Sequence, residues 1–273
     1  MTVPVVVPRA EHAISRKLID PDALKVLYRL HQNDYAAYLV GGSVRDLLLG
    51  RRPKDFDIGT SAHPYQVKRL FRNCWIIGRR FRLAHVRFGM KAIEVATFRR
   101  QLTAAELSAP EEPGEGIVVD ELGDVDRMLH RDNTFGTPEE DAFRRDFTVN
   151  ALFYDIADFS IIDYTGGLRD LEARVIRCIG EPTERFQEDP VRMIRAVSMA
   201  SRLDFRIDPP IDAAIAAHGA ELARSAPPRL TEEIYKLLRA GSSEKAFRML
   251  AERRLLEPIA PAMQKRAGEA LWR

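Results

Sequence analysis

The hydrophobic pattern changes its period part-way along the 273-residue chain. Before residue 189, apolar runs of strand length alternate with short helical segments and end at glycine, proline or aspartate. From Asp189 onward, apolar residues recur at helical spacing and prolines separate the segments, which predicts helices over 189–203, 211–223, 230–240 and 243–256. The sequence therefore predicts an α+β front half followed by an all-helical back half.

The front half begins with a segment up to Arg16 that shows neither the helical nor the strand periodicity of apolar residues and is expected to be an irregular arm. The next segment, 21–31, has Leu24, Leu27 and Leu30 at the spacing of one helical face. Further helices are predicted over 44–49, 64–71 and from Pro138, and strands over 37–40, 55–60, 75–78, 83–88, 92–98, 151–155 and 175–179.

The charges are nearly balanced, with 42 Lys and Arg against 40 Asp and Glu, which excludes a globally polybasic protein. They are strongly segregated along the chain, however. Residues 67–100 hold ten Lys or Arg and one acid, Glu94, whereas residues 104–126 hold eight acids and no base. The basic stretch is expected to attract a polyanion, and the segment 101–130 is expected to be a mobile acidic loop.

The two cysteines, Cys74 and Cys178, lie far apart and form no CxxC motif, which argues against a disulfide scaffold and a cysteine zinc site. The N-terminus has no basic region before its proline-broken apolar run, so a signal peptide is not expected. No uncharged apolar stretch reaches transmembrane length. These features predict a cytoplasmic protein.

The segment Asp55-Phe56-Asp57 places two carboxylates at alternate positions of a predicted strand, where both project to the same face. Such a pair stays ionised when a cation lies between its members, and magnesium takes carboxylate oxygens together with substrate phosphates. Glu94 lies on a neighbouring predicted strand. Three acids on adjacent strands are typical of a two-metal site for displacement at phosphorus, although an exposed polar strand edge has the same pattern.

The segment Gly41-Gly42-Ser43-Val44-Arg45 joins a predicted strand to a predicted helix. Glycines at such a junction let the backbone approach a phosphate, and Arg45 in the first helical turn could reach it. A plain tight turn is the alternative. The Rossmann and Walker A spacings are both absent, which disfavours a dinucleotide-binding oxidoreductase.

The run from Gly41 to Gly50, followed by Asp55-Phe-Asp-Ile, resembles the signature of class II nucleotidyltransferases of the DNA-polymerase-β-like superfamily. This group contains the tRNA CCA-adding enzymes and the bacterial poly(A) polymerases. The segment 70–86 is similar to the poly(A) polymerase version. Further blocks agree with the family in order and spacing over 144–152, 164–171 and 188–196, so the resemblance covers about residues 10–260.

The resemblance implies a polymerase-β-like nucleotidyltransferase head, with a mixed sheet and flanking helices, followed by an all-helical neck and body. We accordingly expect an N-terminal arm over 1–20 and a catalytic head over 21–165. The helical neck and the start of a body domain are expected over 166–273.

The resemblance also implies roles for single residues. Asp55 and Asp57 match the pair that binds two Mg²⁺ ions, and Glu94 matches the acid that helps activate the RNA 3′-hydroxyl. Asp146, together with Arg145, matches the block that meets the ribose and is counted among the catalytic residues. The expected nucleotide-binding residues are Gly41, Gly42, Arg45, Arg145, Asp146, Asn150, Asp189, Arg192 and Arg195.

Asp189, Arg192 and Arg195 match the family's amino-acid template for the incoming base, and their three-residue spacing predicts one helix face. Without the resemblance, a solvated helix face with salt bridges to Glu188 and Asp189 is the simpler interpretation of the two arginines. The family has a further arginine one turn beyond Arg195, where this chain has Ser198. Arg202 lies one turn further on.

The resemblance implies a template-independent RNA nucleotidyltransferase, a polynucleotide adenylyltransferase that adds AMP from ATP to RNA 3′ ends. A tRNA CCA- or A-adding enzyme and a non-catalytic RNA-binding paralogue are the alternatives, and the intact acids disfavour the paralogue. RNA and ATP are the expected partners, and no membrane partner is expected. Phe81, Trp75 and Phe88 lie among the basic residues, where aromatic rings can stack on RNA bases, although Phe81 and Phe88 are at least equally expected to be core residues. The expected RNA-binding residues are Arg79, Arg80 and Arg82.

Overall fold

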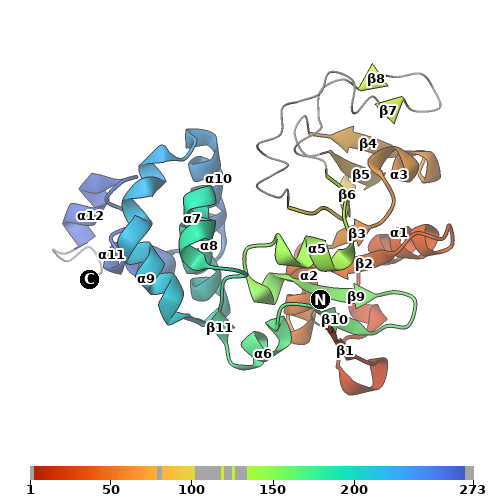
Figure 1. The fold of residues 1–273 in the computed structure, drawn as a ribbon, viewed down its shortest axis with the longest axis horizontal. Helices are drawn as coiled ribbons and strands as arrows, with labels where there is room; N and C mark the ends of the chain where they lie inside the picture. Colours follow the sequence, from red (N-terminus) through yellow and green to blue (C-terminus); the bar gives the residue numbers. More distant parts are fainter. Residues whose placement is uncertain (1–2, 79–81, 102–117, 120–124, 127–133, 268–273) are drawn as a thin grey trace. The chain divides into compact units, whose positions relative to one another are not determined.

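The chain folds into two units, which the computed structural model describes over residues 3–78, 82–101, 118–119, 125–126 and 134–267. One unit comprises Met1–Arg145 and Asn150–Thr165, and the other comprises Asp146–Val149 and Gly166–Arg273. The first unit contains an eight-stranded sheet, and the second is mainly helical (Figure 1). The expected α+β class is confirmed.

The sheet of the first unit has the strand order β1-β10-β9-β2-β3-β6-β5-β4. All neighbours are antiparallel except β3 and β6, which run parallel. This parallel pair lies next to the strand that precedes the glycine turn, so the two predicted motifs meet on adjacent strands. The strands are β1 Val5–Val7, β2 Ala37–Val40, β3 Asp57–Thr60, β4 Cys74–Ile77, β5 Leu83–Phe88, β6 Lys91–Thr97, β9 Leu152–Asp155 and β10 Ile161–Asp163.

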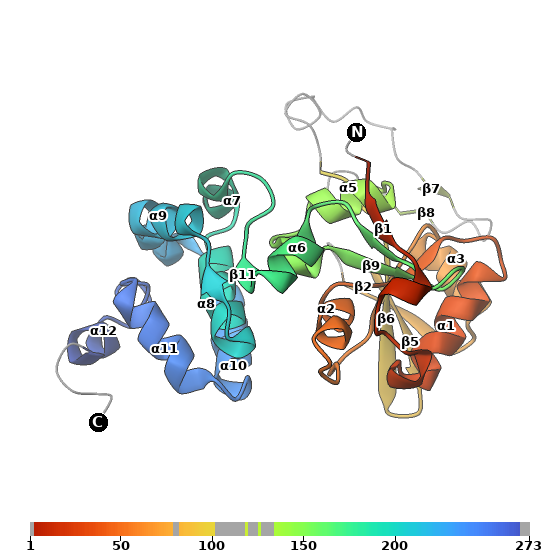
Figure 2. The ribbon, with the colours of Figure 1, turned by 90° about the horizontal axis from the view of Figure 1, so that it is seen from below.

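The helices of this unit are α1 Pro21–His31, α2 Gly42–Leu48, α3 Pro64–Leu70 and α5 Pro138–Phe143. Helix α1 starts where the Asp20 carboxylate accepts the backbone N–H of Asp22 at 2.8 Å, and it buries an apolar face that includes Leu27 and Leu30. Both α1 and α3 pack on the same side of the sheet (Figure 2). One face of β5 and β6 is thereby covered.

Alternation along β5 and β6 separates a covered face from an open one. Ala84, Val86, Ile93 and Val95 are buried on the side of α1 and α3, whereas Glu94 between the last two is exposed. Successive side chains of a strand point to opposite faces. Glu94 therefore lies on the face opposite to these helices.

The N-terminal segment differs from its expected irregular form. Strand β1 adds to the sheet edge through antiparallel pairing with β10, with Val5 opposite Asp163. Pro4 and Pro8 bound this three-residue strand, which hides it from a periodicity argument.

The expected mobile loop over 101–130 lies largely outside the described residues and stays a prediction. Within it, the structure describes β7 Val118–Val119, paired antiparallel with β8 Val125–Asp126.

The second unit is built around α8 Val191–Leu203, whose buried residues include Met193, Ile194 and Val197. It also holds β11 Val175–Ile176, which is the first part of the strand predicted over 175–179. Strand β11 pairs in parallel with β12 Arg206–Ile207, which is a small addition to the expected all-helical region. No helix of the described chain has the length and apolarity to cross a membrane. The remaining helices are α6 Gly167–Glu172, α7 Pro182–Glu188, α9 Pro209–His218, α10 Pro227–Arg239, α11 Ser243–Glu252 and α12 Pro261–Ala267.

A buried carboxylate connects the short segment 146–149 with the rest of the second unit. Asp170 is 1% exposed and accepts hydrogen bonds from the Thr148 hydroxyl at 2.8 Å and the Arg177 Nε at 3.1 Å. Arg177 also contacts Asp208 at 2.5 Å. Because each charge of this network has a partner, the acid is accommodated inside the unit.

Candidate active site

The three predicted metal and catalytic acids meet on the first unit. The parallel register pairs Ile58 with Val95, so Asp57 and Glu94, one residue earlier on each strand, lie level. Asp55 precedes β3, which begins at Asp57, so the predicted strand over 55–60 starts two residues later than expected. Asp55 and Asp57 are exposed, and the Glu94 side chain is 50% exposed.

The carboxylates repel one another. The pKa of Asp57 is raised to about 6 by desolvation from the surrounding protein, then by the negative charges of Glu94 and Asp55, while Arg145 acts in the opposite direction. A cation at this place would relieve the repulsion.

The donor set is compatible with the expected magnesium. Carboxylate oxygens are its preferred protein ligands, and Mg²⁺ is usually held by one or two carboxylates, with waters and substrate phosphates completing the shell. Asp55 and Asp57 fit that pattern. The described residues contain no group of three or more His, Cys, Asp or Glu arranged to hold a metal by themselves, so the metal role of the pair stays a proposal.

His85 lies directly opposite Glu94 in the pairing of β5 with β6. Its Nε2 is 3.6 Å from Glu94 Oε1. From the sequence, His85 is expected only to pack or to contact RNA. The contact of His85 with Glu94 follows from the cross-strand pairing, because directly opposite residues lie close together on one face of a sheet.

The glycine turn brings backbone and arginines together. Gly41 has a φ of 71° and donates its N–H to Leu152 O at 3.1 Å. A Cβ at Gly41 would lie 3.1 Å from the Arg145 guanidinium, and one at Gly42 would lie 3.2 Å from that of Arg45. The close contacts at both positions, together with the positive φ of Gly41, explain why glycine occupies positions 41 and 42.

Arg45 is buried beneath this turn, with 2% of its surface exposed. Its Nε donates to Asp46 Oδ1 at 2.8 Å, and its guanidinium also donates to the Asn150 side chain. Arg145 donates to the Asn150 carbonyl at 3.2 Å, so Asn150 links both arginines. In this structure Arg45 holds the turn, and its expected phosphate contact stays a prediction.

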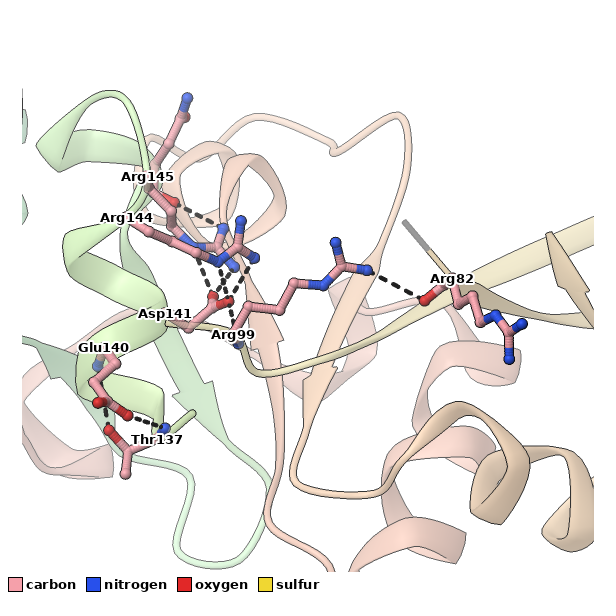
Figure 3. A network of polar contacts seen from close by, with 8 residues as sticks. Arg82, Arg99, Thr137, Glu140, Asp141, Arg144 and Arg145 are labelled. Carbon is pink, nitrogen blue, oxygen red and sulfur yellow. Dashed lines mark hydrogen bonds and ion pairs between the residues drawn. The ribbon is translucent and has the colours of Figure 1, made fainter. Parts of the chain in front are cut away.

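Arg145 is fixed from its other side by Asp141, which is 2% exposed (Figure 3). Asp141 accepts from Arg145 at 2.8 Å, from the Arg144 Nε at 2.8 Å, and from the backbone N–H of Arg99 at 3.2 Å. Burial alone would raise the pKa of Asp141, but the positive charges of Arg145 and Arg144 outweigh it and lower the pKa.

The positioning role of Asp141 is not predicted from the sequence, which indicates here only the start of a helix at Pro138 with acids in its first turn. Helix α5 does have that start, since Thr137 and Glu140 bond each other's backbone N–H groups at 2.7 Å and 3.2 Å (Figure 3). The spacing of Asp141 to Arg144 and Arg145, three and four residues, is the available signal.

In the second unit, Asp146 and Arg195 form an ion pair, with Arg195 NH2 2.6 Å from Asp146 Oδ2. Asp146 is 8% exposed, and its negative charge raises the pKa of Arg195. Both residues are predicted nucleotide ligands. The structure thus joins two blocks that lie far apart in the sequence.

Of the three residues expected to read the base, Arg192 and Arg195 lie on α8, whereas Asp189 does not. Asp189 lies before α8, with φ −150°, because the following Pro190 disfavours a helical conformation at the preceding residue. The predicted helix over 189–203 therefore begins at Val191. Ser198 lies within the helix and is half-buried.

Each base-reading candidate has a protein partner. Arg192 donates to Glu188 Oε2 at 2.8 Å, which agrees with the salt-bridge alternative for this residue. Asp189 accepts from Arg229 at 2.6 Å. Arg229, on α10, was missed because 40 residues separate it from Asp189.

Of the three expected RNA-binding arginines, Arg79 and Arg80 lie outside the described residues. Arg82 donates to the Tyr65 hydroxyl at 2.8 Å and lies 5.5 Å from the centre of its ring. Its carbonyl accepts from Arg99 at 3.3 Å (Figure 3). An RNA contact of Arg82 stays a proposal.

The family assignment comes from sequence comparison. Residues 37–177 match the family model described as the poly A polymerase head domain. The chain belongs to this poly(A) polymerase head family. Residues 204–266 match a second model, the probable RNA and SrmB-binding site of polymerase A. The resemblance inferred from the motifs is thereby confirmed.

Three similar proteins illustrate the relationship. Poly(A) polymerase I of Salmonella typhi is 51% identical over 95% of this chain and 54% of its own length. The CCA-adding enzyme of Lactobacillus johnsonii is 35% identical over 92% of this chain and 58% of its own. A crystal structure of the Bacillus stearothermophilus CCA-adding enzyme with CTP matches with a TM-score of 0.69 and 36% identity, over 86% of this chain and 53% of its own. The chain thus spans about half the length of the relatives it matches.

Proposed function

We propose that the chain is the catalytic part of a template-independent RNA nucleotidyltransferase, which adds AMP from ATP to RNA 3′ ends. The observation that carries this proposal is the level placement of Asp57 and Glu94 on β3 and β6, with Asp55 beside them. The higher identity to poly(A) polymerase I, 51% against 35% for a CCA-adding enzyme, favours poly(A) synthesis over CCA addition.

Glu94 is proposed to act on the attacking group. Its half-exposed carboxylate accepts a hydrogen bond from the RNA 3′-hydroxyl and takes the proton as that oxygen bonds the α-phosphorus of ATP. The bond from the α-phosphorus to the bridging oxygen breaks, and pyrophosphate leaves. Asp55 and Asp57 would hold two Mg²⁺ ions, which supply positive charge against the phosphate oxygens when bound.

The glycine turn is proposed to receive the triphosphate. Gly41 and Gly42 leave their backbone without a Cβ, and Arg145 lies against the turn with its guanidinium anchored by Asp141. A preformed positive group costs less reorganisation when an anion binds. Arg45 and Asn150 hold the turn in place.

The second unit is proposed to recognise the nucleoside. Asp146 uses one carboxylate oxygen for Arg195 and accepts the N–H of Phe147 with the other at 2.9 Å. Each oxygen has a second lone pair for a ribose hydroxyl. Asp189, Arg192 and Arg195 are proposed to read the base, with their present partners holding them in orientation.

The test incubates the chain with Mg²⁺ and each ribonucleotide separately, in the presence of oligo(A) or a tRNA lacking its CCA end. We expect long products from ATP on oligo(A), and none with Asp55→Ala. Addition of one to three nucleotides to the tRNA alone would support the tRNA-specific alternative. RNA binding with no incorporation would support the non-catalytic alternative and overturn the proposal.

A further inference from the structure

The open face of the sheet carries a row of side chains beyond the acids. Trp75 on β4 lies opposite His85 on β5, and His85 lies opposite Glu94 on β6. Directly paired residues share a face of the sheet. Trp75, His85, Glu94 and Asp57 therefore follow one another across four neighbouring strands.

Trp75 is the outermost member of this row and is 51% exposed, whereas its neighbour Cys74 is 6% exposed on the covered face. The Arg87 guanidinium lies 5.5 Å from the centre of the indole ring. Arg87 is two residues from His85 on β5 and is itself exposed. The ring therefore has a cation beside it and remains accessible to solvent.

The distance across the row suits an RNA end. Two strand spacings separate Trp75 from Glu94, which is about 10 Å. A strand of RNA whose 3′-hydroxyl reaches Glu94 would have a base of one of its last nucleotides near Trp75. Stacking on tryptophan accepts any base, and the arginine adds an attraction for phosphate.

The surrounding charge favours a polyanion over an apolar protein partner. Residues 67–100 hold ten Lys or Arg and one acid, and that acid is Glu94 itself. Ile77, 49% exposed, is another apolar residue of β4 on this face. An apolar ring among cations is typical of single-stranded nucleic acid sites.

We propose that Trp75, with Arg87 beside it, is a stacking site for a base near the 3′ end of the acceptor RNA. The inference rests on the proposed function, because it takes Glu94 as the residue that receives the 3′-hydroxyl. Trp75 acts on primer binding and takes no part in the proton transfer.

Tryptophan fluorescence tests the proposal directly, since the chain has two tryptophans, Trp75 and Trp272. In the Trp272→Phe variant, titration with a 3′-blocked oligo(A) should quench the emission of Trp75 saturably. Quenching requires binding but no catalysis, so it reports on the stacking site even if AMP transfer fails. Absence of quenching at concentrations that saturate RNA binding would overturn the proposal.

Steady-state kinetics supply the second readout. Trp75→Ala should raise the KM for oligo(A) about fivefold or more, with kcat and the KM for ATP unchanged, and Trp75→Phe should retain most of the affinity. Phe88→Leu is the matched control, because it removes an aromatic ring from the same hairpin. The Phe88 ring faces α1, where the Lys25 ammonium lies 5.6 Å from the ring centre. An unchanged KM for oligo(A) in an active Trp75→Ala enzyme would contradict the proposal.

Strand β4 is also the edge of the sheet, where a second copy of the chain is the competing occupant. Analytical ultracentrifugation of the chain without RNA distinguishes a second copy from RNA as the occupant of this strand. A dimer that Trp75→Ala dissociates would overturn the RNA assignment, and a monomer would support it.

Discussion

Asp57 and Glu94 lie level on two parallel strands because each directly precedes one member of the Ile58–Val95 pair. The buried side chains of that pair fix the register, since a slip of either strand by one residue would turn its buried member of the pair toward solvent. The apolar core of the first unit therefore sets the spacing of two exposed acids.

Glu94→Gln should lower kcat for AMP transfer by about a hundredfold, because the amide cannot take the proton of the attacking hydroxyl. The KM for ATP should change little, since no nucleotide contact is assigned to Glu94. Initial rates at saturating oligo(A) measure the effect. A kcat within twofold of the parent would remove Glu94 from the proposed mechanism.

Gly41→Ala should destabilise the chain by about 2 kcal/mol, since a positive φ and a close contact with Arg145 both oppose a Cβ. Gly50→Ala is the matched control: Gly50 has a φ of +67° with nothing within 4 Å of its Cβ position. Gly50→Ala should lose only the stability that corresponds to backbone strain. Urea unfolding measures both, and equal losses would contradict a role of the Arg145 contact.

Asp141→Asn should lower the free energy of unfolding by about 2 to 3 kcal/mol at pH 7, since it leaves two arginines without their buried partner. The folded-state pKa of Asp141 is lowered, so its contribution is present above the unfolded pKa of about 3.9 and is lost as the pH falls through the folded value.

The difference between the parent and Asp141→Asn should therefore narrow below about pH 4. Chemical unfolding over a pH series checks this. Glu139→Gln, on the same helix, serves as the control and should stay within about 0.5 kcal/mol of the parent at every pH. A gap that widens in acid would show that Asp141 is not held ionised.

Arg192→Ala should raise the KM for ATP and reduce the preference for ATP over CTP, because it removes donors proposed to face the base. Arg239→Ala, on α10, is the control and should change neither. Competition between the two nucleotides on oligo(A) measures the preference. An unchanged ratio with Arg192→Ala would contradict base reading by Arg192 and leave it the structural contacts with Glu188 and the Arg185 carbonyl.

Local pattern was sufficient to predict several elements of the first unit. Helix α1 and strand β2 have the predicted bounds of 21–31 and 37–40, because each has a regular period and a clear end signal. These features depend on residues close in sequence.

The features that were missed depend on distant residues. Strand β1 exists through its pairing with β10, about 155 residues later. Arg229 reaches Asp189 across 40 residues, and His85 reaches Glu94 only once the hairpin forms. Periodicity carries no information on such pairings, so tertiary contacts decide them.

AMP transfer by Asp57→Asn tests the central claim most directly, because it removes one charge from the paired acids and keeps the side-chain shape. Asp34→Asn, which changes an exposed acid of the same unit, is the control. We predict loss of ATP incorporation into oligo(A) with Asp57→Asn and full activity with Asp34→Asn. The thermal stability of Asp57→Asn should be at least that of the parent, because the change relieves the repulsion from Asp55 and Glu94. Equal incorporation by the two variants would contradict the assignment of the active site.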